Sequence, residues 1–167
     1  LGNENGNRLT PRHKKETGSF YSALGLHYLC TRKKNIPLYR IDMKKYILDL
    51  TVTENLRLHA NYVLLKLTSP SPLPEMLPGQ FAEIRVDGSP TTFLRRPISI
   101  NYVDRQRNEV WFLIQLVGDG TKRLGEAKAG DIINVVLPLG NCFTMPEKPS
   151  DKLLLVGGGV GTAPMLY

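Results

Sequence analysis

Residues 95–100 read Arg95-Arg96-Pro97-Ile98-Ser99-Ile100, so two guanidinium groups stand directly before a proline and a hydroxyl. The alternation of Ile98, Ile100 and Tyr102 predicts a β-strand here. Arginine forks suit phosphate oxygens in bidentate fashion, and the serine could reach a polar ring atom of a ligand. An edge strand that begins at a proline and carries solvated arginines would give the same pattern. The motif alone leaves both interpretations open.

A second segment lies downstream, where strong β-formers over residues 110–117 lead into Gly118, Asp119 and Gly120. Thr121 then stands where a short helix over residues 121–127 is predicted to begin. Small residues and a hydroxyl at a helix N-terminus can bind an anion. A capped surface helix without any ligand also accounts for this segment.

A third segment comes late in the chain, where Leu153-Leu154-Leu155-Val156 leads into Gly157-Gly158-Gly159-Val160-Gly161-Thr162. The apolar run predicts a buried parallel strand, and glycines lack the Cβ atoms that would keep backbone N–H groups from a pyrophosphate. A flexible tail is the alternative. If the strand forms, we expect it to open a nucleotide-binding domain that these residues do not complete.

The rest of the pattern is all-β. Six short strands are predicted over residues 46–53, 62–67, 81–86, 98–103, 110–117 and 132–137, each next to Gly, Pro, Asp or Asn turn residues. With one short helix, they suggest a closed or nearly closed antiparallel barrel, an arrangement that removes exposed strand edges.

Together, the order and spacing of these segments resemble the ferredoxin-NADP reductase-like proteins, and within them the electron-transfer subunits of two-subunit, NAD-dependent bacterial dihydroorotate dehydrogenases. The resemblance covers residues 43–167 and includes Leu77-Pro78-Gly79-Gln80-Phe81 and Leu137-Pro138-Leu139-Gly140-Asn141. It implies a six-stranded Greek-key barrel that binds FAD, followed by the first strand and glycine turn of an α/β nucleotide-binding domain.

The resemblance also implies site residues. Arg96 would lie on the FAD pyrophosphate, Ser99 near the isoalloxazine ring, and Gly120 with Thr121 around the pyrophosphate. The full implied set is Arg96, Pro97, Ile98, Ser99, Leu113, Ile114, Gln115, Gly120 and Thr121 for FAD, and Gly157, Gly159, Gly161 and Thr162 for the nicotinamide nucleotide. Ile98 stands where plant-type reductases place a stacking tyrosine, so aromatic stacking is not expected there. No catalytic side chain and no metal ligand is expected.

The function implied is an electron relay in pyrimidine biosynthesis. FAD would exchange a hydride with NAD(H) and pass single electrons, through a [2Fe–2S] cluster, between NAD and a dihydroorotate dehydrogenase catalytic subunit in a hetero-oligomer. The cluster needs four thiolates, and the two cysteines, Cys30 and Cys142, cannot supply them. We therefore expect its ligands in a C-terminal part beyond these residues, and we expect this chain alone to be inactive.

Two alternatives differ in class. The chain could belong to another flavoprotein reductase subunit of hydrogenase, sulfite reductase or transhydrogenase type, which the cysteine spacing of that further part would distinguish. It could also be a barrel without flavin that serves only assembly or binding, which flavin absorbance would distinguish.

Composition limits the partners. Hydrophobic residues make up 41% and charged residues 22%, values typical of globular proteins, and no apolar run approaches the roughly 20 residues that cross a bilayer. Of the net charge of +7, residues 1–42 carry +5, with eight Lys and Arg against three Asp and Glu. We therefore expect neither a membrane nor a nucleic acid as partner, although a genuine basic arm stays open. The few unpaired cysteines favour the cytoplasm.

These patterns predict four parts of the chain. Residues 1–42 form a basic leader, disordered or an upstream extension, and residues 43–145 form the barrel. Residues 146–151 form a linker, and residues 152–167 begin the nucleotide domain.

Overall fold

A computed structural model describes residues 44–146, 148 and 152–167. The predicted leader over residues 1–42 lies outside the described residues, and so does most of the predicted linker. Domain boundaries at those two places therefore stay predictions.

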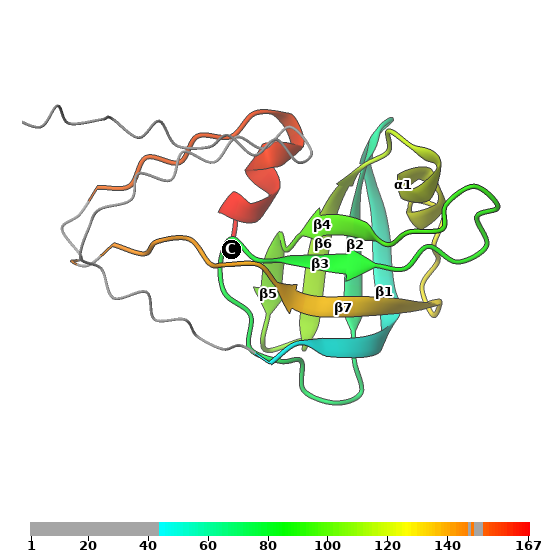
Figure 1. Cartoon of the computed structure of the whole chain (residues 1–167), viewed down its shortest axis with the longest axis horizontal. Helices are drawn as coiled ribbons and strands as arrows, with labels where there is room; N and C mark the ends of the chain where they lie inside the picture. Colours follow the sequence, from blue (N-terminus) through cyan, green and yellow to red (C-terminus); the bar gives the residue numbers. More distant parts are fainter. Residues whose placement is uncertain (1–43, 147, 149–151) are drawn as a thin grey trace, which may run out of the picture. The chain divides into compact units, whose positions relative to one another are not determined.

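The strands of the described residues form a single antiparallel sheet (Figure 1). Its strands run in the order β4-β3-β7-β1-β2-β6-β5. The connection from β2 to β3 passes over two intervening strands, as in a Greek key. The bounds are β1 (Tyr46–His59), β2 (Tyr62–Thr68), β3 (Phe81–Ile84), β4 (Arg96–Ser99), β5 (Tyr102–Asp104), β6 (Glu109–Gln115) and β7 (Ile132–Leu139). The predicted all-β class is confirmed.

The sheet curls so that its two edges, β4 and β5, belong to one bent segment of the chain. Six strands were predicted, and the described residues form seven because the predicted strand over residues 98–103 changes its partner midway. The Ile100 N–H donates to the Gln80 carbonyl next to β3 (3.0 Å), whereas the Asn101 N–H donates to the Trp111 carbonyl of β6 (2.9 Å). The segment thus passes from one edge of the sheet to the other and curls the sheet into a barrel, which stays open along the outer side of β4.

Alternation along the strands builds the core inside this curl. In β2 every second residue is buried, and in β6 the same alternation continues from Val110 to Ile114. The buried side chains of these two strands are Val63, Leu65, Leu67, Val110, Phe112 and Ile114. Because side chains of a strand point alternately to its two faces, the sequence pattern alone fixes which face of each strand lies inside.

The two loop motifs on which the resemblance rests meet at one end of the barrel. Gly140 adopts φ +77°, and a Cβ there would lie 2.9 Å from the ring of Phe81. The buried Gln80 side chain accepts a hydrogen bond from the Leu77 N–H (2.7 Å) and donates to the Gly140 carbonyl (3.3 Å). These residues therefore join the start of β3 to the end of β7.

The one described α-helix, α1 (Asp119–Leu124), is shorter and begins earlier than the predicted residues 121–127. The Asn55 side chain of β1 donates to the carbonyls of Leu124 (3.2 Å) and Ala127 (2.9 Å), which holds the C-terminal end of α1 on the sheet. In the part of the chain that the structure describes, no helix is long and apolar enough to cross a membrane.

The predicted strand over residues 153–156 is wrong for the described structure. These four apolar side chains are 57–87% exposed and form no strand. A parallel strand needs neighbours that cover both faces, and the described residues supply none. The glycines after it instead lead into a 3₁₀ helix, η1 (Gly159–Met165), which contacts β6.

Candidate functional site

Strand β4 consists of the four predicted residues Arg96, Pro97, Ile98 and Ser99, and all of them are half-buried. On one side β4 pairs with β3, with Ser99 opposite Phe81 and Arg96 opposite Ile84. On its other side no described strand is paired with it. A proline, which has no N–H to donate, suits such an edge. The motif is therefore an edge strand, and it also lies close to β6.

The two arginines of the motif have different environments. The Arg95 guanidinium donates to the carbonyls of Glu83 (3.3 Å) and Asn134 (3.1 Å) and to the Asn134 side chain, so it joins β3 to β7. Among the described residues, the Arg96 guanidinium has no hydrogen-bond or ion-pair partner. Arg95 is thus committed to the fold, whereas Arg96 has its five N–H donors available for an anion.

Arg96 lies along the first turn of α1. A Cβ built on Gly120 would come 2.8 Å from Cδ of Arg96 and 3.0 Å from Cγ2 of Thr92. Gly120 is buried, so the alkyl part of Arg96 passes over it in the space that any other residue would fill. Two residues that are 24 positions apart in the sequence, both from the predicted site, are thereby in direct contact.

The end of β6 presents main-chain groups on the same side. The Leu116 N–H donates to the Asn61 carbonyl, which lies next to β2. The Trp111 carbonyl accepts from the Asn101 N–H on the opposite side of β6. Because main-chain groups alternate in direction along a strand, those of Leu113 and Gln115 point away from β2. Strand β5 pairs with β6 only as far as Trp111, so the N–H and carbonyl of Leu113 have no described strand partner on that side. Ile114 points its side chain into the core.

The Thr121 hydroxyl forms hydrogen bonds within the turn itself. Its Oγ1 accepts hydrogen bonds from the N–H groups of Val117 and Gly118, both at 3.1 Å, and donates to the Gly118 carbonyl at 3.0 Å. The hydroxyl therefore closes the turn that leads into α1. Asp119 accepts a hydrogen bond from the Thr91 hydroxyl (2.8 Å), which ties the loop before β4 to the same turn.

The predicted nicotinamide-nucleotide residues gather separately, in and just before η1. Gly161 is buried, and its N–H donates to Gly158 (2.9 Å); the Thr162 hydroxyl donates to the Gly159 carbonyl (2.9 Å). A Cβ on Gly157 would come 2.7 Å from Cε of Met165. The turn is thus folded back on itself. It is joined to the barrel by Asn101, a residue that the sequence patterns did not single out.

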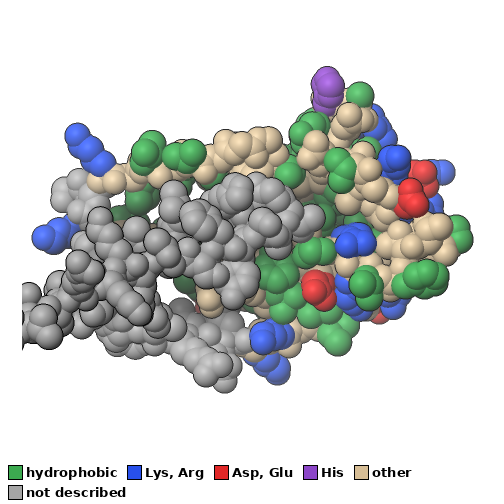
Figure 2. Space-filling view, turned by 45° about the horizontal axis from the view of Figure 1, so that its top comes forward, with side chains coloured by type: hydrophobic (Ala, Val, Ile, Leu, Met, Phe, Trp, Pro, Cys, Tyr) green, Lys and Arg blue, Asp and Glu red, His purple; other side chains and the backbone are tan. Residues whose placement is uncertain are grey.

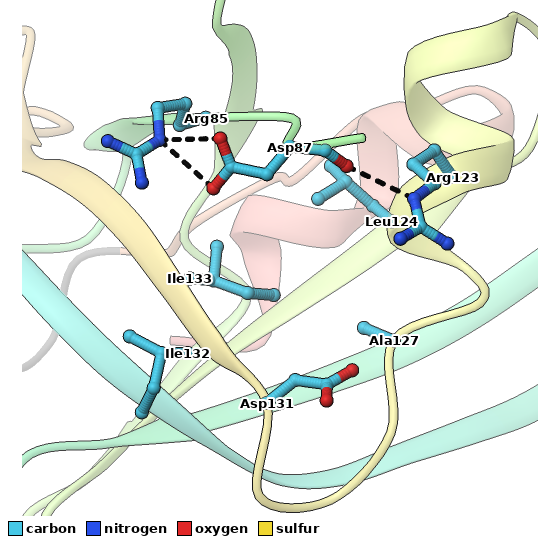
Figure 3. Close-up of a pocket in the computed structure, with 8 residues that line it drawn as sticks. All are labelled: Arg85, Asp87, Arg123, Leu124, Ala127, Asp131, Ile132 and Ile133. Atoms are coloured by element: carbon cyan, nitrogen blue, oxygen red, sulfur yellow. Dashed lines mark hydrogen bonds and ion pairs between the residues drawn. The ribbon is translucent and has the colours of Figure 1, made fainter. Parts of the chain in front are cut away.

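A hollow on the surface lies away from this set, between the end of β3, α1 and the start of β7 (Figure 3). Its charged groups already have hydrogen-bond or ion-pair partners. Nε of Arg85 lies 2.8 Å from the Asp87 carboxylate, and Nε of Arg123 donates to the Asp87 carbonyl at 3.1 Å. The Asp131 carboxylate accepts the Lys128 N–H at 2.8 Å. Because each of these charged groups already has a partner, Arg96 and the open edge of β4 are the better candidate site.

Charged side chains are spread over the visible surface. Where grey atoms do not cover the face in Figure 2, Lys and Arg side chains lie scattered among apolar, acidic and other groups. This face shows no single, continuous basic patch of the kind that binds nucleic acid.

Relatives were found by sequence. No family model matches the chain. The dihydroorotate dehydrogenase B (NAD(+)) electron transfer subunit of Shouchella clausii is 44% identical over 91 residues, which are 54% of this chain and 35% of that protein. The subunit of the same name from Fusobacterium nucleatum is 37% identical over 118 residues, which are 70% of this chain and 46% of that protein. The chain spans about a third to a half of the length of these relatives.

Solved structures with the same fold include proteins named as reductases. A cytochrome P450 reductase from Amycolatopsis matches with TM-score 0.65 and 26% identity, over 76% of this chain and 39% of that one. An NADH-dependent reduced ferredoxin-NADP oxidoreductase matches with TM-score 0.60 and 30% identity, over 70% of this chain and 41% of that one. Phthalate dioxygenase reductase shares the fold with TM-score 0.60 and 24% identity, over 72% and 37%. The predicted resemblance and the predicted barrel are both confirmed.

Proposed function

We propose that this chain is the flavin-binding part of an electron-transfer subunit of a two-subunit, NAD-dependent dihydroorotate dehydrogenase. Its sequence relatives are subunits of that name. One observation carries the flavin site. The Arg96 side chain, which has no partner among the described residues, lies over the Gly120 main chain at the open edge of the barrel. Segments far apart in sequence thereby offer a cation and main-chain groups to one ligand.

The residues present fit FAD. A pyrophosphate would pair with the Arg96 guanidinium in bidentate fashion, and the missing side chain of Gly120 leaves room for the alkyl chain of that arginine next to the main chain. The N–H and carbonyl of Leu113 and the hydroxyl of Ser99 would orient the ring system along β4 and β6. FAD supplies hydride and single-electron chemistry when bound, while the protein supplies geometry and electrostatics. No side chain of the site needs to act as an acid or base.

The wider reaction is inferred from the relatives. In the whole protein, we propose, electrons pass between NAD and the catalytic subunit in a hetero-oligomer of the cytoplasm that serves pyrimidine biosynthesis. A [2Fe–2S] cluster would take its four thiolates from outside residues 1–167, which hold Cys30 and Cys142 only. A leader of residues 1–42 would precede the flavin barrel of residues 43–145. Residues 146–151 would be the linker, and residues 152–167 the start of the nicotinamide-nucleotide part.

Titration with FAD tests the proposal. The purified chain should bind one FAD and keep its yellow absorbance through gel filtration, and FMN, which lacks the pyrophosphate and adenosine, should bind more weakly. A chain that stays colourless in excess FAD would instead favour a barrel that serves only assembly or binding.

The polypeptide of residues 1–167, loaded with FAD, should not oxidise NADH. A complete nucleotide site uses a ribose-binding residue about 20 positions after the glycine turn, and within these residues only Met165, Leu166 and Tyr167 come after Pro164. Stopped-flow mixing with NADH should leave the flavin absorbance unchanged on the time scale of turnover, while dithionite bleaches it fully. Bleaching by NADH at an enzymatic rate would show that the barrel and turn suffice.

A further inference from the structure

The glycine turn is attached to the barrel by a buried hydrogen bond. Nδ2 of Asn101 donates to the Ala163 carbonyl at 2.7 Å, across 62 positions of sequence. Asn101 is 6% exposed and Ala163 is 2% exposed, so water does not compete for this contact. Because a buried amide donor without a partner is costly, the bond favours one position of η1 on the barrel.

The end of the segment is attached at a second point. The Tyr167 hydroxyl donates to the Met76 carbonyl at 2.7 Å, and the Tyr167 ring meets Tyr102 edge to face, with centroids 6.2 Å apart. Leu153 to Val156, in contrast, are exposed and make no strand pairing. The position of the turn is therefore set by the residues on its C-terminal side and not by the apolar run before it.

The attachment point lies next to the candidate flavin strand. Asn101 stands two residues after Ser99, the last residue of β4. It lies at the bend where the hydrogen-bond partner of the chain changes from β3 to β6. Ala163 directly follows Thr162 of the glycine turn. The path from the flavin strand to the turn thus consists of two residues and one hydrogen bond.

We propose that Asn101 is a positioning residue that fixes the nicotinamide-nucleotide turn relative to the flavin strand. The proposal rests on the function proposed above, because the distance between the turn and the flavin strand matters only if both bind their nucleotides. Hydride transfer needs reacting atoms about 3–3.5 Å apart, so a turn that drifts would misplace the nicotinamide. Asn101 would hold the turn through its side-chain amide, from a strand that is itself part of the barrel.

Hydrogen–deuterium exchange of the purified chain tests the attachment. With Asn101→Ala, amides of residues 157–167 should exchange about tenfold faster, the equivalent of one hydrogen bond of ~1.4 kcal/mol. Peptides from β1, β2 and β6 should keep their exchange rates. Asn55→Ala is a matched control because the Asn55 amide also donates to main-chain carbonyls, those of Leu124 and Ala127. It should loosen the end of α1 and leave residues 157–167 unchanged.

Asn101→Asp separates positioning from a general loss of packing. A protonated carboxyl can donate to the Ala163 carbonyl, whereas an ionised one cannot and would repel it. Attachment favours the neutral form and raises the pKa of the introduced carboxyl, so protection of residues 157–167 should be present at low pH and lost as pH rises through that pKa. The unsubstituted chain, corrected for intrinsic exchange, should show no such change. Equal protection of the Asp variant at all pH values would overturn the proposal.

FAD titration of the same variants keeps the two proposals apart. Asn101→Ala should bind FAD within about twofold of the unsubstituted chain while its turn is released, because the amide is directed at Ala163 and not at the flavin site. If no variant binds FAD, the proposed function fails and the exchange result still decides the attachment. If FAD binds normally and Asn101→Ala leaves residues 157–167 protected, the positioning role is wrong.

Discussion

Replacing Arg96 with alanine should weaken FAD binding about ten- to a hundredfold. The reason is that Arg96 offers the site a guanidinium that has no other partner among the described residues. Hydrogen bonds to charged groups contribute roughly 1.5–3 kcal/mol, and about 1.4 kcal/mol corresponds to a factor of ten in the dissociation constant. Titration calorimetry or quenching of flavin fluorescence measures the change directly.

Arg85→Ala is the matched control for Arg96→Ala. Arg85 directly follows β3 and also carries one positive charge, but its guanidinium is paired with Asp87 at 2.8 Å. Its removal should change FAD affinity by less than about twofold, because an exposed ion pair contributes little and the site does not include it. If both variants lose affinity equally, a general electrostatic attraction explains the binding; if neither does, Arg96 is not at the pyrophosphate.

Replacing Gly120 with alanine should weaken FAD binding about tenfold without unfolding the barrel. The new methyl group would start 2.8 Å from Cδ of Arg96, far closer than carbon atoms approach, so the arginine must move. Since the Arg96 side chain is flexible and has no other partner among the described residues, it can move at small cost to the fold. The expected signature is reduced FAD affinity with a nearly unchanged melting temperature.

Gly118→Ala controls for the loss of a glycine in the same turn. A Cβ on Gly118 meets nothing within 4 Å, so this variant should bind FAD almost as the unsubstituted chain does. Combining Gly120→Ala with Arg96→Ala gives a second check. If the methyl group acts by displacing the arginine, the double variant should be little worse than Arg96→Ala alone. Fully additive losses would contradict that explanation.

The barrel was largely predictable because its strands alternate between a buried and an exposed face. The number of strands was not, since residues 98–103 keep their alternation through the bend where Ile100 and Asn101 turn to different partners. The strand predicted over residues 153–156 does not form, for a different reason. Their composition suits a buried strand, but a strand also needs neighbouring strands to pair with. The local sequence does not show whether such neighbours are present.

The candidate site was only partly visible in the sequence. Arg95 and Arg96 are chemically identical neighbours, and only the fold commits Arg95 to Asn134 while leaving Arg96 without a partner among the described residues. The resemblance implied that Arg96 and Gly120 serve the same pyrophosphate, but the direct contact between them became visible only in the structure. Asn101 gave no signal at all, because its role depends on a carbonyl 62 positions away.

Mapping bound FAD onto the backbone by NMR would show whether β4, the end of β6 and the first turn of α1 form one flavin site. On addition of FAD, we expect the largest amide shifts at Arg96 and Ser99 of β4, at Leu113 and Gln115 near the end of β6, and at Gly120 in the first turn of α1. Amides of the hollow between β3, α1 and β7 should stay in place. If the largest shifts instead occur at Asp87, Arg123 and Ile132 while β4 is undisturbed, FAD does not bind at β4.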